Sequence, residues 1–310
     1  MKKTIILIIL LAIVFFNSEA FASTIKFAQI SDLHYQSNIL RKNINYYSLL
    51  IIDEVAEEIN KDKDIKLTLI TGDIINKRKK DDAKFIFEHF NEIFEKPWYS
   101  VFGNHDLGGH LFFKMKLIYL LKNINKIFSH IKTDHYSFRP NNDMVFIGLN
   151  SNYTTKRTPI GYISKKQINF LKDTLSKVSD NDVIVIFMHH TPIKFPLVHV
   201  NHFISNEEVF MEILKSQTNP ILLLGGHYHS CKIEKEKNII KVATPSLSTL
   251  PLAYRTITID NLASKTIFKF EYKTVNNELQ NFIFRNIKKE INPYREGGKS
   301  DKNIKIEISK

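Results

Sequence analysis

Cysteine is nearly absent from this chain, and that limits how the fold can be stabilised. The 310 residues include one cysteine, Cys231, so no internal disulfide can form. A protein without disulfides must be held together by its hydrophobic core, or by something else such as a bound metal. Hydrophobic residues make up 43% of the sequence and aromatic residues 12%, which indicates a globular protein.

Long hydrophobic runs are absent except near the N-terminus. Two lysines precede an uncharged apolar run at residues 5–16, and a small-residue ending follows at residues 20–22. This layout predicts a secretory signal peptide, residues 1–22, with cleavage after Ala22. The alternative is an uncleaved membrane anchor, but this run spans only about 18 Å as a helix, whereas a bilayer needs about 20 apolar residues. We therefore expect an exported protein, periplasmic or secreted, with no stable membrane span after cleavage.

Internal repeats and low-complexity linkers are also lacking, which favours a single folded domain. We predict that this domain covers residues 23–284. Residues 285–310 hold eight basic and four acidic residues with little apolar period, and we predict a basic, loosely ordered C-terminal tail there.

The formal charge of +12 suggests a class of partner without fixing one. It suits an anionic substrate, an anionic surface or nucleic acid. Basic residues are spread along the chain, however, so a general richness in Lys, Asn and Ile explains the charge as well. No interleaved stripe of basic and aromatic residues is present of the kind that stacks bases. Nucleic acid is therefore not the favoured partner.

Five short apolar runs, each typical of a buried strand, end in Asp, Asn or His. In sequence letters they are IKFAQI before SDLH, KLTLI before TGD, WYSVF before GNHD, DVIVIFM before HHTP, and PILLL before GGHYH. Helical apolar spacing occurs between them, at residues 46–60, 82–94, 167–175 and 206–217. In an open α/β sheet, side chains just past the carboxyl ends of neighbouring strands meet in one crevice. The five clusters are therefore predicted to form one site.

The side chains in these clusters are suited to binding divalent metal ions. They are Asp32, His34, Asp73, Asn104, His105, Asp106, His189, His190, His227 and His229. Imidazole, carboxylate and amide oxygen without a thiolate suit zinc, manganese, iron or cobalt. Asp32 and His34 are two residues apart, as are His227 and His229, so each pair would share a face of an extended segment. A lone histidine is usually structural, but here all five loops carry residue types that can bind a metal.

The five blocks DLH, GD, GNHD, HH and GGHYH, in this order, resemble the calcineurin-like metallophosphoesterase family, and the resemblance runs from about residue 25 to residue 259. It implies an α/β fold, a four-layer sandwich of two mixed β-sheets flanked by helices. It also implies two divalent metal ions at the carboxyl ends of the strands. The first ion would be held by Asp32, His34 and His229, the second by Asn104, His189 and His227, and Asp73 would bridge them.

The resemblance also assigns roles around the metal ligands. We favour His189 over His190 as the ligand because it comes first after its strand. His105 would lie beside the substrate oxygens and protonate the leaving group, and Asp106 could orient it. Two ions close together lower the pKa of a shared water, so that hydroxide can attack phosphorus in line. Tyr35, His110, His199 and His202 are further candidates for lining the pocket.

The expected function is that of an exported phosphoesterase with a small phosphoester substrate. Its blocks look closest to the branch that includes cyclic-nucleotide and glycerophosphodiester phosphodiesterases, so diesters are favoured over monoesters. Purple acid phosphatases need a tyrosine near the second block, and GDIINK contains none. The alternatives are a metal-dependent nuclease, or a non-enzymatic basic protein that uses metal for folding and binds an anionic polymer. The sequence does not determine the oligomeric state.

Overall fold

The computed structural model describes residues 23–37, 43–107, 111–128, 133–153, 158–193, 195, 203–287 and 293–310. The predicted signal peptide lies outside these ranges. So do three residues predicted to line the pocket, His110, His199 and His202. Their predictions are therefore not addressed by the structure. No helix in the described ranges is long and apolar enough to cross a membrane.

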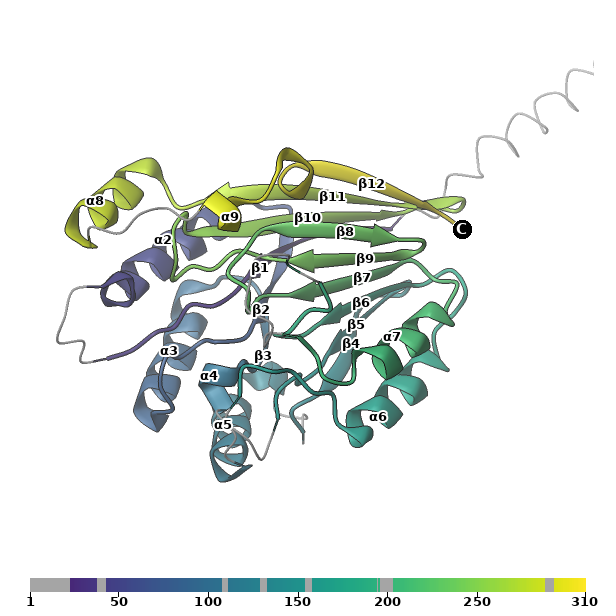
Figure 1. Ribbon diagram of the computed structural model, residues 1–310, viewed down its shortest axis with the longest axis horizontal. Coiled ribbons are helices and arrows are strands. Elements are labelled where there is room, and N and C mark those ends of the chain that lie inside the picture. The colour runs from purple at the N-terminus through teal and green to yellow at the C-terminus, as the bar shows by residue number, and fades with distance from the viewer. Residues whose placement is uncertain are drawn as a thin grey trace, which may run out of the picture.

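In the described part of the chain, two six-stranded mixed sheets pack face to face (Figure 1). The first sheet has the order β12-β11-β10-β1-β2-β3 and the second β4-β5-β6-β7-β9-β8. The strands of the first sheet are β1 (Ser23–Ile30), β2 (Ile65–Thr71), β3 (Trp98–Val101), β10 (Ala253–Asn261), β11 (Lys265–Thr274) and β12 (Ile304–Ser309). Those of the second are β4 (Tyr136–Asn141), β5 (Met144–Gly148), β6 (Val183–Phe187), β7 (Ile221–Gly225), β8 (Lys232–Glu236) and β9 (Ile239–Ala243).

Helices cover the outer faces of both sheets, which gives four layers. Those on the first sheet are α2 (Ser48–Lys61), α3 (Lys80–Ile93), α5 (Leu111–Ile124) and α8 (Asn277–Ile287), and those on the second are α6 (Lys165–Leu175) and α7 (Glu207–Lys215). The shorter helices are η2 (Ile44–Tyr47), α4 (Asn104–Leu107), η3 (Lys126–Phe128), α9 (Pro293–Glu296) and η4 (Lys299–Asp301). The predicted four-layer α/β sandwich is confirmed.

The apolar spacing of each element explains this layering. In β1, Phe27 faces the core between the sheets, while Ala28 and Ile30 face the helices. Such a strand is buried on both faces, so its sequence is a nearly continuous apolar run. In α3, Ile86, Phe87 and Phe90 recur at helical spacing and are buried against the first sheet.

The strand directions bring the five polar clusters to one end of the sandwich. In the first sheet, β1 pairs in parallel with β2, and β2 with β3. In the second, β6 pairs in parallel with β7. The carboxyl ends of these five strands carry the five polar sequence blocks, and the contacts described below show that the blocks meet there.

The C-terminal tail corrects one prediction. The segment from residue 285 is not loosely ordered in its described part, because β12 pairs antiparallel with β11 over six residues. The reason is a period of two at Ile304, Ile306 and Ile308, of which the last two are buried in the core between the sheets. This strand was not predicted from the sequence, because Lys305 and Glu307 alternate with the isoleucines in a segment that is otherwise charged.

Candidate metal centre

Unusual backbone geometry positions most of the predicted ligands. The non-glycine residues with positive φ include five of them: Asp32, His34, Asp73, His227 and His229, with φ between 48° and 69°. This left-handed conformation costs an L-residue about 1–2 kcal/mol. Strain of this kind tends to gather at functional sites. The expectation that each Asp/His pair shares a face of an extended segment is therefore wrong, since every member of both pairs has left-handed rather than extended backbone.

Two glycines allow the backbone to approach the carboxylates closely. A Cβ at Gly226 would overlap Ser31 Oγ and Asp32 Oδ2, and a Cβ at Gly103 would overlap the Asp73 carboxylate. Each loop therefore passes too close to an acidic side chain for any larger residue. His227 N donates to Asp32 Oδ2 at 3.0 Å, which ties the loop after β7 to the end of β1.

Asp32, His34 and His229 form one group of potential ligands. His229 Nε2 lies 3.2 Å from Asp32 Oδ1 and 3.3 Å from His34 Nε2. The ligand atoms of these three residues all lie within 4.8 Å of one another. Asp32 is fully buried, and its Oδ1 accepts no hydrogen bond in the described part of the chain. A buried carboxylate oxygen facing two imidazole nitrogens is the arrangement that a divalent cation fits.

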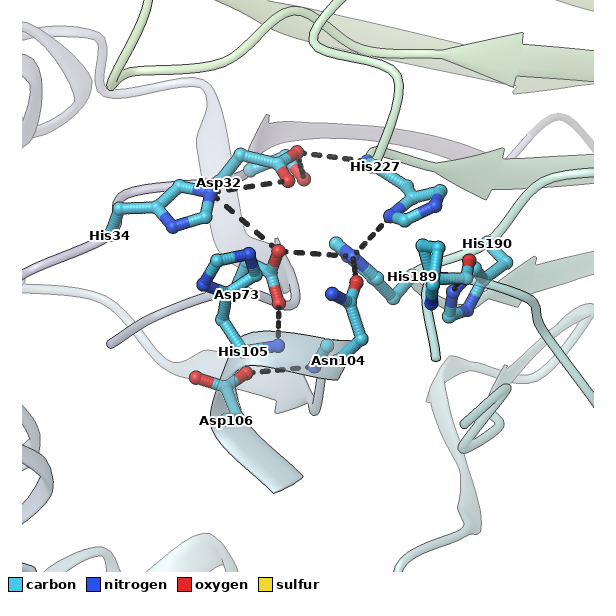
Figure 2. Close-up of polar contacts among 12 residues, drawn as sticks. Asp32, His34, Asp73, Asn104, His105, Asp106, His189, His190 and His227 are labelled. Atoms are coloured by element: carbon cyan, nitrogen blue, oxygen red, sulfur yellow. Dashed lines mark hydrogen bonds and ion pairs between the residues drawn. The ribbon is translucent and has the colours of Figure 1, made fainter. Parts of the chain in front are cut away.

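A second group lies on the other side of Asp73 (Figure 2). His189 Nε2 is 3.1 Å from Asn104 Oδ1 and 3.0 Å from His227 Nδ1. Asp73 Oδ2 is 3.3 Å from His189 Nε2 and 3.6 Å from His34 Nε2. One carboxylate oxygen therefore faces both groups, and the seven side chains that sequence reasoning selected converge on one place.

The two central histidines differ in their protonation when no metal is bound. Burial lowers the pKa of His34 to about 4, so its ring is neutral at pH 7. Burial would also lower the pKa of His189, but the Asp73 carboxylate outweighs it and raises that pKa to about 9. The Asp73 pKa is correspondingly held well below its usual range, although burial opposes this. In the metal-free protein a proton on His189 therefore partly balances Asp73.

His190 lies close to this cluster, but both of its ring nitrogens have structural partners. Its Nδ1 is 2.9 Å from Ser151 Oγ and its Nε2 is 3.0 Å from Pro159 O. The His190 ring lies beside that of His227, with ring centroids 4.2 Å apart. Judged by distance alone, His190 could therefore also be a ligand. In His189, by contrast, Nδ1 lies 2.9 Å from the Thr71 carbonyl oxygen. Its Nε2 faces another candidate ligand, Asn104. Such a second contact orients a metal-binding histidine.

His105 and Asp106 do not interact as predicted. His105 Nδ1 lies 2.9 Å from Asn76 O, and its ring packs edge-on against that of His34. Asp106 accepts backbone hydrogen bonds from Gly103 at 2.7 Å and Ile75 at 2.9 Å (Figure 2). The prediction that Asp106 orients His105 is wrong, because consecutive residues of the α4 turn point in different directions. Asp106 joins the loops after β2 and β3, and burial together with the Asp73 charge raises its pKa to about 7.

A cavity of about 450 Å³ opens onto these groups. The polar side chains of Asn43, Asn45 and Thr249 line it together with His105. Tyr35, a predicted lining residue, does not contribute, since it is 7% exposed and its ring stacks on Phe85.

Sequence reasoning missed one charged residue of this cavity, Arg295. It comes from the C-terminal segment that was predicted to be loosely ordered. No sequence motif near Arg295 indicates that it lines the cavity, because its position depends on the path of the chain after α8.

Comparisons with known proteins agree with this arrangement. A family model described as calcineurin-like phosphoesterase matches residues 25–231. A 3',5'-cyclic adenosine monophosphate phosphodiesterase, CpdA, of Haemophilus influenzae is 25% identical over 238 residues, which cover 74% of this chain and 79% of that protein. A probable cyclic nucleotide phosphodiesterase of Colwellia psychrerythraea is 25% identical over 212 residues, 66% of this chain and 71% of that protein.

Solved structures share the fold at lower identity. A dimetal phosphatase from Danio rerio superposes with a TM-score of 0.59 at 16% identity, covering 81% of this chain and 99% of that one. A purple acid phosphatase from yellow lupin gives a TM-score of 0.53 at 10% identity, covering 80% of this chain and 51% of that one. At such identities the similarity concerns the fold.

Proposed function

The chain belongs to the calcineurin-like phosphoesterase family, and from this premise we propose that it is a metal-dependent phosphodiesterase for small phosphoesters. One observation carries the proposal: Asp73 Oδ2 lies between two groups of nitrogen and oxygen donors, 3.3 Å from one and 3.6 Å from the other. A single carboxylate shared by two such groups suits a pair of metal ions.

The proposed ligands divide between two ions. Asp32, His34 and His229 would hold the first, Asn104, His189 and His227 the second, and Asp73 both. These nitrogen and oxygen donors suit zinc, manganese, iron or cobalt. When bound, such ions supply an activated water as nucleophile and neutralise charge on the phosphoryl group.

The protein's own side chains complete the proposed reaction. The Asn104 amide and the His105 ring line the cavity beside the ligands, where they can donate hydrogen bonds to phosphoryl oxygens. The Asn76 carbonyl accepts the Nδ1 proton of His105 at 2.9 Å, which leaves Nε2 to carry the proton that the departing alkoxide needs. Asp106 keeps the α4 turn in place through its two backbone contacts.

A preference for diesters is supported by the two relatives with phosphodiesterase names, each 25% identical to this chain. The test is a panel of substrates offered to manganese-loaded protein that begins at Ser23: bis-p-nitrophenyl phosphate, p-nitrophenyl phosphate, cyclic AMP, glycerophosphodiesters and DNA. We expect the small diesters to give the highest kcat/KM. Preferential cleavage of DNA would favour the nuclease alternative, and no hydrolysis at all would favour the non-enzymatic one.

Replacing His105 separates proton donation from metal binding. His105→Ala should keep its metal and lose about 10²–10⁴-fold in kcat/KM on a diester with an alkoxide leaving group, the usual effect of removing a general acid. A nitrophenolate leaves without a proton, so the loss on bis-p-nitrophenyl phosphate should be clearly smaller. His189→Ala is the matched control, and it should fail on both substrates and bind less metal. Equal losses for His105→Ala on both substrates would reject the acid role.

We also propose export, based on the charged start, the short apolar run and the small-residue ending of residues 1–22. Sequencing the N-terminus of the protein recovered from its native host should give Ser23 as the first residue. Recovery of chains that still begin at Met1 in a membrane fraction would instead identify the apolar run as an anchor.

A further inference from the structure

The described C-terminal segment 293–302, here called the strap, is fastened beside the metal centre. The Arg295 carbonyl accepts a hydrogen bond from Cys231 N at 2.9 Å, and Cys231 follows the candidate ligand His229 by two residues. Gly297 has a φ of 68°, and a Cβ there would overlap the Cys231 carbonyl. In Figure 1 helix α9, which contains Arg295, accordingly lies close to the start of β8.

A buried arginine holds the other end of the strap. Arg255 is fully buried, and its Nη2 donates to Asp301 O at 2.6 Å and to Cys231 Sγ at 2.9 Å. The Asp301 carboxylate accepts from the backbone N–H groups of Ile233 and Gly298, each at 2.9 Å. Because buried charge-assisted hydrogen bonds fix geometry strongly, the position of the strap is specified by the core.

The side chain of Arg295 turns into the catalytic cavity. It is half-buried and lines the cavity of about 450 Å³. Among the described lining residues, Asp73 and Arg295 are the permanently charged ones, and Asp73 belongs to the metal centre. The Arg295 guanidinium makes no ion pair or hydrogen bond within the described ranges. Burial lowers the pKa of Arg295, and the charge of Asp32 partly offsets this, so the two groups are within electrostatic range.

His105 and Arg295 reach the cavity wall from different elements, α4 and the strap. The rings of His105, His34 and His229 follow one another, with centroid separations of 4.5 Å and 5.2 Å. The strap is hydrogen-bonded to Cys231, two residues beyond His229. If the leaving oxygen of a phosphoester meets His105, the retained substituent is the part of the substrate that is left to contact Arg295.

We propose that Arg295 is a specificity-determining residue that binds a second anionic group, a carboxylate or a phosphate, on the retained substituent of the substrate. This rests on the proposed phosphodiesterase function. A guanidinium presents paired N–H donors that match the oxygens of a carboxylate or phosphate. The lining of the same cavity includes uncharged polar side chains, those of Asn43, Asn45, Ser248 and Thr249, which suit hydroxyl groups on the same substituent.

The experiment compares two diesters that differ in this one charge. Methyl p-nitrophenyl phosphate and 2-carboxyethyl p-nitrophenyl phosphate share a leaving group, so the chemical step is matched. Wild type should have the higher kcat/KM on the carboxyethyl ester. Arg295→Ala should lose about 10- to 100-fold on that ester and less than about threefold on the methyl ester, as expected for the loss of a charge-assisted hydrogen bond. Arg295→Lys should recover part of the loss.

Two controls separate recognition from structural damage. Lys299→Ala removes an exposed cation of the same strap, outside the cavity, and should leave both rates unchanged. Added guanidinium at millimolar concentration should partly restore Arg295→Ala on the carboxyethyl ester. Equal losses on the two esters, or a loss of bound metal in Arg295→Ala, would overturn the proposal. If wild type hydrolyses neither ester, the phosphodiesterase function itself is wrong and the inference falls with it.

Discussion

Asp73→Asn should abolish hydrolysis, with kcat/KM lower by at least about 10³-fold, since charge stabilisation at both ions would be disturbed. The Asp73 carboxylate is buried, and its Oδ2 faces both ligand groups. An amide of the same size keeps the shape but removes the negative charge, and its NH₂ group cannot bind a cation. The measurement is kcat/KM on bis-p-nitrophenyl phosphate together with the metal content of the variant.

Asp106→Asn is the matched control for Asp73→Asn. Asp106 is also a buried carboxylate beside the cluster, but its oxygens accept backbone hydrogen bonds from Gly103 and Ile75. Its replacement should reduce stability, because an NH₂ group would face one of those N–H donors, while both metals remain bound. The assignment of Asp73 as the shared ligand would be contradicted if the two variants lost equal activity and kept equal metal.

Removing the metals should abolish activity and also lower the melting temperature. Five ligands have strained positive-φ backbone, and the buried Asp32 and Asp73 carboxylates belong to one group of potential ligands. An ion present at 100 times its Kd stabilises the folded state by about 2.7 kcal/mol, which corresponds to roughly 5–10 °C for a domain of this size. Thermal unfolding with and without a chelator measures this difference, and an unchanged melting temperature would argue against ligands shared among five loops.

The proton on His189 makes this metal binding depend on pH. In the metal-free protein the Asp73 carboxylate raises the pKa of His189 to about 9, despite burial, so the ring is protonated at pH 7. A metal ion needs the neutral ring and must displace that proton. The apparent affinity of the metal-free protein for manganese should therefore increase as the pH rises toward about 9.

The sequence was sufficient to predict the four-layer fold and to select the seven side chains that the structure brings together. The shared site was predicted from short buried strands and the polar residues that end them, which are local features of the chain. The four-layer fold and the choice of seven ligands among the ten candidates were implied by the family resemblance. The left-handed backbone at Asp32 and His227 was not predictable, because nothing in the residue types of Asp or His requires it. It results from close contacts such as that between Gly226 and Asp32, which join distant loops.

The remaining errors also concern contacts over long sequence separations. Asp106 was assigned to His105 on the family resemblance, yet its carboxylate accepts a hydrogen bond from the backbone N–H of Ile75 on another loop. Arg295 was placed in a loose tail because its segment is charged and shows little apolar period. Its position depends on Cys231 and Arg255, which lie 64 and 40 residues away along the chain. Such placement follows from the assembled sheets rather than from a local pattern.

The most direct test of a dinuclear centre is a titration of metal-free protein with manganese, in which bound metal and the rate of bis-p-nitrophenyl phosphate hydrolysis are measured on the same samples. Activity should rise to its maximum only when about two ions are bound per chain, since the seven ligands form two groups around Asp73. Full activity with one ion or fewer per chain, or activity that persists in excess chelator, would contradict it.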